Sequence, residues 1–277
     1  MARKKKKKLP YWLYILIIIV AILGSDELKS FIGLKTDQEK IERPFVNTDM
    51  GQLEIPSMPN GKQGQVIQRT GYTLAYDKKT KTPQWVAWEL TKEETKGNHE
   101  RTDKFLPDPN VEGAKVVTTD YTGSGYDRGH MAPAGDMKWS KKAMEESFYM
   151  SNICPQIHHL NTGDWNELEA NTRKWARRYG SVYVTCGPIY NGRRRTQYIG
   201  KNRVKVPDAF FKVILIQSPK KTCALGFFFE NEAGQRPLNE YLVSVDYLEQ
   251  TTGIDFFPAL PDELENTLEA ETHNSLP

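Results

Sequence analysis

The segment "GSGYDRGHMAPAGDMKWS", residues 123–140, places an arginine and a histidine on either side of one glycine. The neutral imidazole of His130 can take a proton from water at physiological pH, because the unperturbed pKa of histidine is about 6.5. The guanidinium of Arg128 is permanently charged and presents a planar set of donors that suits phosphate oxygens. This pair favours phosphodiester hydrolysis, although such a pair in a glycine-containing loop is more often only solvated.

A second set of polar side chains follows in "SNICPQIHHLNTGDWNELEANTRKWA", residues 151–176. Asn161 lies at the mouth of a predicted long helix, and Glu169 lies two turns inside it, about 12 Å further along the axis. An amide oxygen and a more distant carboxylate suit a hard cation that keeps several of its waters, as Mg²⁺ does. The alternative is that Asn161 is only a helix cap and Glu169 only a surface carboxylate.

Other residues near these two segments are expected to be structural. Asp127 is suited to holding the loop, and Gly129 and Gly135 are expected to let the backbone turn tightly. His158 and His159 are adjacent at a helix entrance, so their side chains face different ways. We therefore do not expect these two histidines to bind a metal as a pair.

The elements that must position these side chains are a sheet and two helices. "GYTLAYD" (71–77) and "QWVAWEL" (84–90) alternate aromatic and β-branched residues around a turn, which predicts a hairpin. Further strands are predicted at 181–190, 206–217 and 223–231, and helices at 140–152 and 161–180. Strands on both sides of a helical block, without strict alternation, predict an α+β fold with a mixed, largely antiparallel central sheet flanked by helices.

The N-terminus is not expected to belong to this fold. An uncharged stretch, "LPYWLYILIIIVAILG" (9–24), follows a run of basic residues. It predicts a single transmembrane anchor or a cleaved signal segment, with the rest of the chain on the non-cytoplasmic side or exported. The expected organisation is this segment in residues 1–24, a linker in 25–63, the folded domain in 64–265 and a C-terminal tail in 266–277.

Charge is concentrated locally rather than spread over the chain. The formal net charge is +3, and residues 3–8 alone supply six positive charges, so the remainder carries −3. An anionic partner must therefore meet a local patch. "NGRRRTQYIGKNRVKV" (191–206) holds six basic residues and no acidic one. We expect phosphate contacts from part of this arm, with a solvated hairpin tip as the alternative; the residues are Arg193, Arg194, Arg195, Lys201 and Arg203.

The three cysteines, Cys154, Cys186 and Cys223, form no CxxC pair and do not cluster with histidines. This spacing argues against a structural zinc site. Either one disulfide with a remaining thiol or three buried thiols is consistent with the sequence.

Taken together, several segments resemble one family. "YDRGHMAPAGDM" and "FYMSNICPQIHHLNTGDWNELE" are similar to the DNA/RNA non-specific endonucleases, the group containing endonuclease G, which have a ββα-metal (His-Me finger) site. "TPQWVAWEL", "VYVTCGPIY", "VPDAFFKVIL" and "DYLEQTTGIDFFPALPD" resemble other parts of the family in the same order. The resemblance covers residues 65–265.

The resemblance implies three central roles in the site. His130 would be the general base that activates water. Asn161 would be the one direct protein ligand of Mg²⁺, with Mn²⁺ as the alternative metal. Glu169 would position a water bound to the metal.

It also implies three supporting roles. Arg128 would stabilise charge at the phosphate, and Asn152 would support the site near the base. Arg101, in "ERTDKFLPDP", lies where the family often has a further catalytic arginine.

The predicted function is therefore a Mg²⁺-dependent endonuclease that hydrolyses DNA and RNA without sequence preference, and the family implies that a homodimer is also to be considered. One alternative is a catalytically silent, membrane-tethered nucleic-acid-binding protein. The other is a phosphodiesterase of narrower substrate range.

Overall fold

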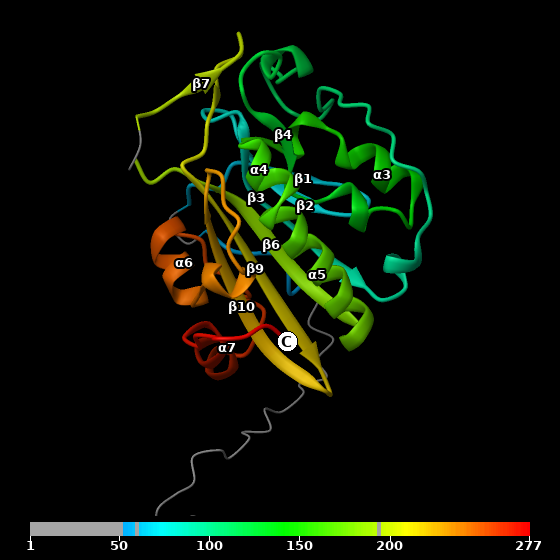
Figure 1. Cartoon of the computed structure of the whole chain (residues 1–277), viewed down its shortest axis with the longest axis vertical. Coiled ribbons are helices and arrows are strands. Elements are labelled where there is room, and N and C mark those ends of the chain that lie inside the picture. Colours follow the sequence, from blue (N-terminus) through cyan, green and yellow to red (C-terminus); the bar gives the residue numbers. More distant parts are fainter. Residues whose placement is uncertain (1–51, 59–60, 193–194) are drawn as a thin grey trace, which may run out of the picture. The chain divides into compact units, whose positions relative to one another are not determined.

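The computed structural model describes residues 52–58, 61–192 and 195–277, all of which lie in the second of the chain's two units, Pro44–Pro277. They form an α+β fold around a seven-stranded sheet with the order β1-β2-β3-β6-β9-β10-β11 (Figure 1). All neighbouring strands in it are antiparallel, whereas the sequence predicts a mixed, largely antiparallel sheet. The strands are β1 (Gln65–Gln68), β2 (Thr73–Asp77), β3 (Thr82–Thr91), β6 (Ser181–Ile189), β9 (Ala209–Ser218), β10 (Lys221–Glu230) and β11 (Leu242–Val243).

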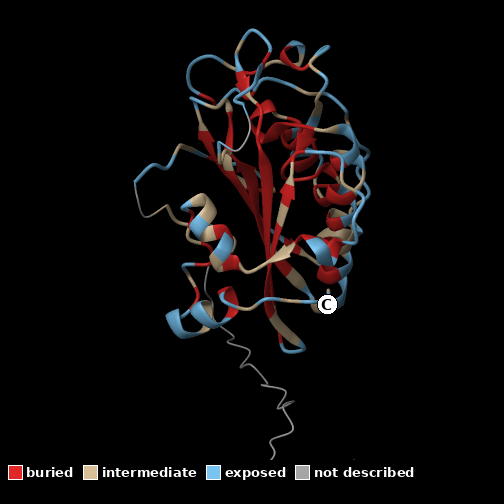
Figure 2. Cartoon of the chain, turned by 60° about the vertical axis from the view of Figure 1, so that its left-hand side comes forward, coloured by how far each residue is buried: buried red, intermediate tan, exposed pale blue. Residues whose placement is uncertain are grey.

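Helices cover both faces of this sheet. Alternate residues of β9 point to opposite faces, so Phe210 and Ile214 belong to the core beneath helix α5 (Asp164–Tyr179). Phe211 and Val213 belong to the core on the other face, beneath α6 (Val245–Thr252) and α7 (Asp262–Glu269). Figure 2 shows the buried strands between helices whose outer surfaces are exposed. Burial on both faces explains why β9 is almost continuously apolar.

The remaining elements form two small ribbons and several short helices. The ribbon β4 (Asp127–His130) with β5 (Ile153–Gln156) precedes helix α4 (His158–Thr162), and β7 (Tyr198–Ile199) pairs with β8 (Val204–Lys205). Short 3₁₀ turns lie at Glu94–Lys96, Thr118–Asp120, Ala134–Asp136, Met150–Asn152 and Leu238–Tyr241.

The two predicted helices differ from those in the structure. The first, α3, is shorter, covers Lys141–Ser147, and is capped by Ser140, whose hydroxyl accepts a hydrogen bond from the Ala143 amide at 3.3 Å. The second is broken at Gly163 into α4 and α5. A Cβ atom at Gly163 would lie 2.5 Å from the His159 carbonyl oxygen, so only glycine allows this close passage. Asn161 consequently lies in the last turn of α4 and does not cap the long helix.

The folded unit extends beyond the expected boundaries of the domain. Part of the expected linker packs on the fold, because Leu53 is buried and the Thr185 hydroxyl donates to the Glu54 carbonyl at 2.6 Å. The expected tail is also packed, because the Trp175 indole donates to the Pro277 carbonyl at 3.2 Å.

The predicted membrane segment, residues 9–24, lies outside the described residues. Within the part of the chain that the structure describes, none of the helices combines the length and the apolar character needed to span a bilayer.

All three cysteines of the chain are described. Cys154, Cys186 and Cys223 are buried, and none forms a disulfide. Of the two alternatives left by the sequence, the structure therefore has three buried thiols.

Candidate active site

The ribbon β4–β5 and the helices α4 and α5 frame the candidate site. Antiparallel pairing runs from Asp127 opposite Gln156 to His130 opposite Ile153. Gly129 lies within β4, where a Cβ atom would approach the Gln156 Oε1 atom to 2.2 Å. The glycine therefore leaves room for the Gln156 side chain, and because it lies in a strand the expectation that it makes a tight turn is wrong.

Asn152 holds the chain immediately after His130. Its Oδ1 accepts a hydrogen bond from the Ala132 amide at 2.9 Å. Its Nδ2 donates to the carbonyl oxygens of Ala132 and Ser147, each at 2.9 Å. Because Asn152 is fully buried and does not line the pocket, it supports the site from behind.

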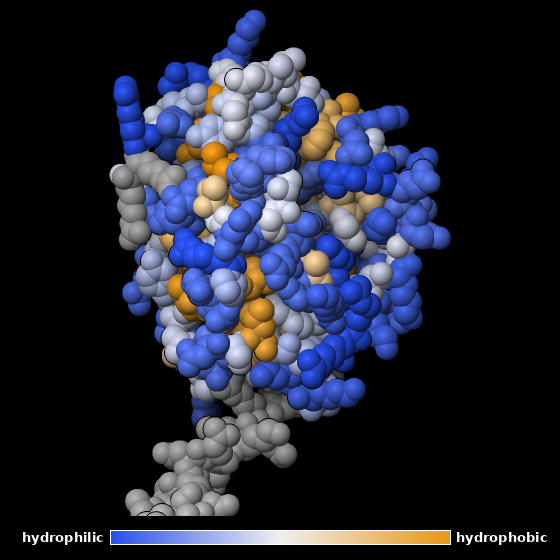
Figure 3. Space-filling model, viewed as in Figure 1, coloured by the Kyte–Doolittle hydropathy of each residue, from blue (hydrophilic) through white to orange (hydrophobic). Residues whose placement is uncertain are grey.

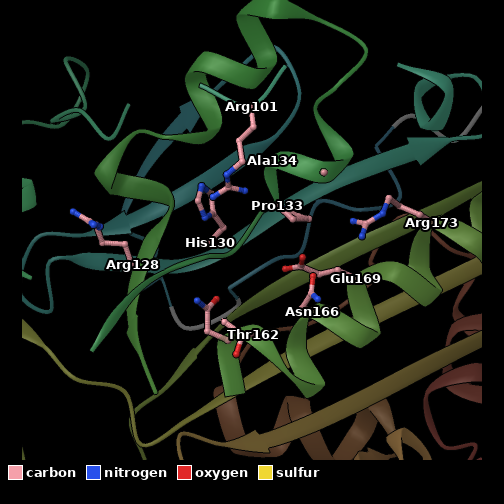
Figure 4. Close-up of a pocket in the computed structure, with 11 residues that line it drawn as sticks. Arg101, Arg128, His130, Pro133, Ala134, Thr162, Asn166, Glu169 and Arg173 are labelled. Carbon is pink, nitrogen blue, oxygen red and sulfur yellow. The ribbon is translucent and has the colours of Figure 1, made fainter. Parts of the chain in front are cut away.

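A polar pocket of about 370 Å³ lies in front of this framework (Figure 4). His130 and Arg101 lie on one side of it, and Glu169 and Asn166 project from α5 on the other. The lining residues are Arg101, Arg128, His130, Pro133, Ala134, Gly135, Asn161, Thr162, Asn166, Glu169 and Arg173. Five of the expected site residues therefore share one pocket, from Arg101 to Glu169 in the sequence.

His130 is packed between two aromatic rings. The centroid of its ring lies 5.3 Å from that of Phe105 and 4.8 Å from that of Phe148. Burial, together with the positive charge of Arg101, lowers the pKa of His130 to about 3. Its Nε2 has no hydrogen-bond partner among the described residues. The imidazole is therefore neutral at neutral pH, which is the form that accepts a proton.

The orientation of the Asn161 amide follows from its partner. The Asp127 Oδ2 atom accepts a hydrogen bond from Asn161 Nδ2 at 2.9 Å. A carboxylate can only accept, so the NH₂ group must face Asp127 and the amide oxygen must face away from it. An amide oxygen is the donor that a hard cation takes. This contact agrees with the structural role expected for Asp127.

His158 also contacts Asp127 rather than pairing with His159 around a metal. Its Nδ1 atom lies 2.8 Å from the same Oδ2 atom, and its side chain is largely exposed. His158 therefore helps to hold the carboxylate that orients Asn161.

Glu169 lies half-buried at the floor of the pocket. Burial raises the pKa of Glu169 to about 7, and the positive charge of Lys212 is the largest effect that opposes this rise. The negative charge of Asp136 adds to the rise. The ionisation of this carboxyl group therefore depends on the charges around it.

Two of these surrounding charges form a pair that the sequence did not reveal. Arg173 Nη1 donates to Asp136 Oδ1 at 2.8 Å, and the Trp88 indole donates to Asp136 Oδ2 at 3.1 Å. Arg173 follows Glu169 by one helical turn, so the two face the same pocket. The i, i+4 spacing of Glu169 and Arg173 was therefore the signal in the sequence that Arg173 would face the same site as Glu169.

Lys212 is the third residue that sequence reasoning missed. It lies on the α5 face of β9, is 1% exposed, and places its Nζ atom 4.0 Å from the centroid of the Trp165 ring. A desolvated ammonium over an indole is stabilised by about 2 kcal/mol. The signal was a single lysine within an otherwise apolar strand, "AFFKVILIQ".

The two arginines at the pocket stack on the same rings that pack against His130. The Arg128 Cζ atom lies 4.7 Å from the Phe105 ring centroid, and the Arg101 Cζ atom lies 4.9 Å from that of Phe148. Arg101 Nε also lies 2.5 Å from Asp103 Oδ1. Two permanent positive charges are thereby held at the pocket around the neutral imidazole.

The described part of the basic arm does not line this pocket. Arg193 and Arg194 lie outside the described residues. Arg195 and Lys201 are exposed, and the Arg203 Cζ atom lies 4.4 Å from the Tyr198 ring centroid. None of these three described residues lines the pocket.

A second pocket, of about 450 Å³, adjoins the first. It shares Arg128 and Asn161 with the first pocket. Its lining residue Tyr126 donates a hydrogen bond to Gln197 of the arm at 2.7 Å. The molecular face that carries α4 and α5 is largely hydrophilic (Figure 3).

The antiparallel ribbon, the helix that follows it and the polar pocket they share define a ββα-metal nuclease. A sequence model of the DNA/RNA non-specific endonucleases matches residues 49–263. The chain belongs to this family, and it is a metal-dependent endonuclease.

Relatives and a solved structure agree with this placement. The chain is 37% identical to mitochondrial endonuclease G of Homo sapiens over 207 aligned residues. The aligned region covers 70% of this chain and 70% of the relative. It is 41% identical over 207 residues to mitochondrial nuclease EXOG of Homo sapiens, covering 69% of this chain and 56% of the relative. EndoG in a crystal structure of the EndoG/EndoGI complex has a TM-score of 0.69 and 32% identity, covering 79% of this chain and 95% of that one.

Proposed function

We propose that this endonuclease hydrolyses phosphodiester bonds of both DNA and RNA without sequence preference, with Mg²⁺ as its metal and Mn²⁺ as a substitute. His130 acts as the general base and Asn161 as the direct protein ligand of the metal. The observation that carries this proposal is the shared pocket, where a neutral imidazole, an oriented amide oxygen and a carboxylate meet two arginines.

The residues present fit a hard divalent cation. The amide oxygen of Asn161 faces away from Asp127, and the Glu169 carboxyl group lines the same pocket. Oxygen donors of this kind, few in number, suit Mg²⁺, which keeps most of its waters. Asn161 would hold the metal directly and Glu169 through water. When bound, the metal supplies Lewis-acid polarisation of a phosphoryl oxygen and stabilises the leaving oxygen.

His130 takes the proton from the attacking water. Its neutral ring has a nitrogen without a partner among the described residues, and the rings of Phe105 and Phe148 fix its orientation. Arg128 and Arg101 bind the phosphate and stabilise the negative charge that develops on it. Asn152 keeps His130 in position through the backbone of the following turn.

The substrate is held through its phosphates. The expected contacts are from Arg193, Arg194, Arg195, Lys201 and Arg203, and such contacts give affinity without sequence information. Both human relatives are called mitochondrial nucleases. For this chain we propose membrane anchoring or export through residues 9–24, with the catalytic domain on the non-cytoplasmic side, and assembly as a homodimer.

The test is cleavage of supercoiled plasmid and of total RNA, each with Mg²⁺ and with EDTA. We expect metal-dependent cleavage of both polymers. His130→Ala should lose about 10²- to 10⁴-fold of the rate, the usual span for a general base. Asn161→Ala should also lose cleavage at low Mg²⁺. His159→Ala, an exposed histidine on the same short helix, is the matched control and should cleave normally.

Three results would contradict the proposal in different ways. Full activity of His130→Ala would remove the assigned base. Salt-sensitive retention of DNA by a folded protein that cleaves neither polymer would indicate a silent binding protein. Cleavage of short model esters alone would indicate a phosphodiesterase of narrower range.

A further inference from the structure

A second group of oxygen donors lies on the face of the sheet opposite to α5. Asp246 and Glu249 are one turn apart on α6, and Glu269 is the last residue of α7. One carboxylate oxygen from each of the three lies within 4.8 Å of the others. The helices that carry them pack on the second core through Val245 and Leu268. This group shares no residue with the catalytic pocket.

Glu269 is the member of this group whose carboxylate is buried without a full set of hydrogen-bond partners. It is only 4% exposed, and its Oε1 atom has no hydrogen-bond partner among the described residues. In the same part of the chain, none of the three carboxylates lies within ion-pair distance of a lysine, arginine or histidine. A buried carboxylate without a partner is costly, so it requires either a proton or a cation.

The charges around Glu269 favour a cation. The carboxylates of Glu249, Glu265, Asp255 and Asp246 all lie close enough to Glu269 to act on it electrostatically. Glu269 also lies at the C-terminal end of α7, where the helix dipole is negative and the last turn holds no basic residue. Several negative charges thus converge on one point.

Part of the group is already fixed in place. The Glu249 Oε1 atom accepts a hydrogen bond from the Phe256 amide at 2.7 Å. The neighbouring Asp255 accepts one from the Ser57 hydroxyl at 2.9 Å. Of the three proposed donors, Glu249 is therefore already held in place.

We propose that Asp246, Glu249 and Glu269 bind one Ca²⁺ ion. Donors that are all oxygen select a hard cation over thiolate- or imidazole-preferring metals. Ca²⁺ takes oxygen at about 2.3–2.6 Å, so donors across the ion are about 4.6–5.2 Å apart. The three donor atoms lie within 4.8 Å of one another, which leaves room for such an ion among them. Mg²⁺ demands near-octahedral geometry at about 2.0–2.1 Å and usually takes only one or two carboxylates, so a set of three carboxylates favours Ca²⁺.

The ion would be structural, since it joins α6 to α7 away from the catalytic pocket. The competing explanation is that Glu269 simply holds a proton. That alternative predicts a response to pH and none to Ca²⁺, so the two explanations separate cleanly.

The experiment uses the full-length chain in detergent with Asn161→Ala, which weakens metal binding at the catalytic pocket. CaCl₂ is titrated by calorimetry, and thermal unfolding is followed with and without it. We expect one Ca²⁺ per chain and a rise in Tm of about 5–10 °C at a hundred times Kd. Glu269→Gln and Asp246→Asn, each added separately, should abolish both signals. Glu263→Gln, an exposed carboxylate on the first turn of α7, should leave them unchanged.

Glu269→Gln removes a repelled buried charge, so this variant should fold at least as well without Ca²⁺, and Asp246→Asn provides an independent check. The proposal is overturned if about 10 mM CaCl₂, above the range of weak calcium sites, gives neither heat nor a Tm shift. It is also overturned if the shift persists in both variants. An equal shift with MgCl₂ would overturn the assignment of the ion.

Discussion

Asp127 and Asn161 are joined by a hydrogen bond of 2.9 Å in which the carboxylate accepts from the amide nitrogen. The two residues are 34 positions apart in the sequence, on β4 and α4. The face that Asn161 presents to the pocket is therefore decided by the strand that also carries the proposed base.

Replacing this acceptor should impair metal binding without unfolding the protein. In Asp127→Asn, the new side chain can donate to the Asn161 oxygen and turn the amide around. We expect the Mg²⁺ concentration for half-maximal cleavage to rise about 10- to 100-fold, as for other residues that orient a ligand. Metal titrations of the rate measure this. His158→Ala removes the other contact to the same oxygen and should change the value by less than about threefold; an equal effect would contradict the argument.

Metal binding should weaken as the pH falls below 7. Because the pKa of Glu169 is raised to about 7, its carboxyl group gains a proton in this range and loses the charge that attracts a cation. His130, whose pKa is lowered to about 3, stays neutral. We therefore expect half-saturating Mg²⁺ to rise about tenfold per pH unit from 7 to 5, with the rate at saturating metal largely kept. The same titration in Glu169→Gln should be nearly independent of pH.

Lys212 should control the ionisation of Glu169 from beneath. Without the ammonium group of Lys212 the pKa of Glu169 rises further, because the positive charge of Lys212 is the largest effect that lowers this pKa. We expect Lys212→Met to slow cleavage at pH 7 and subsaturating Mg²⁺ by about tenfold, and to recover much of the loss at pH 9. A pH profile of the rate checks this. Lys205→Met, which removes a lysine 4.5 Å from the Tyr190 ring and away from the pocket, should leave the profile unchanged.

The basic arm should contribute to affinity through salt-dependent contacts. Each phosphate contact contributes about 0.9 to the slope of log K against log salt concentration on duplex DNA. The triple variant of Arg195, Lys201 and Arg203 to glutamine should therefore reduce the slope by up to about 2.7. DNA binding at several KCl concentrations measures it. Lys220→Gln, an exposed residue in the turn between β9 and β10, is the control, and an unchanged slope in the triple variant would remove the arm from the interface.

The sequence allowed the main sheet and much of the pocket to be predicted. The alternation of apolar and aromatic residues marks β2, β3 and the long strands, and the two motifs place His130, Asn161 and Glu169 in order. The break at Gly163 was not predictable, because the residues on both sides of it continue one helical pattern.

Contacts between charged residues that only the fold brings together also could not be predicted from the sequence. Arg173 finds Asp136 across 37 positions. Lys212 reaches the region of Glu169 because β9 is buried on both faces and its register turns this residue toward α5. Periodicity shows that such a position is internal, but it does not show which carboxylate lies above it.

The three buried thiols bear on where this enzyme can be made and used. A fold without covalent cross-links needs no oxidant to mature and loses nothing in a glutathione-rich compartment. Burial also raises the pKa of Cys186 to about 12, which leaves almost none of its reactive thiolate. The same folded state is thus available on the reducing and the oxidising side of a membrane.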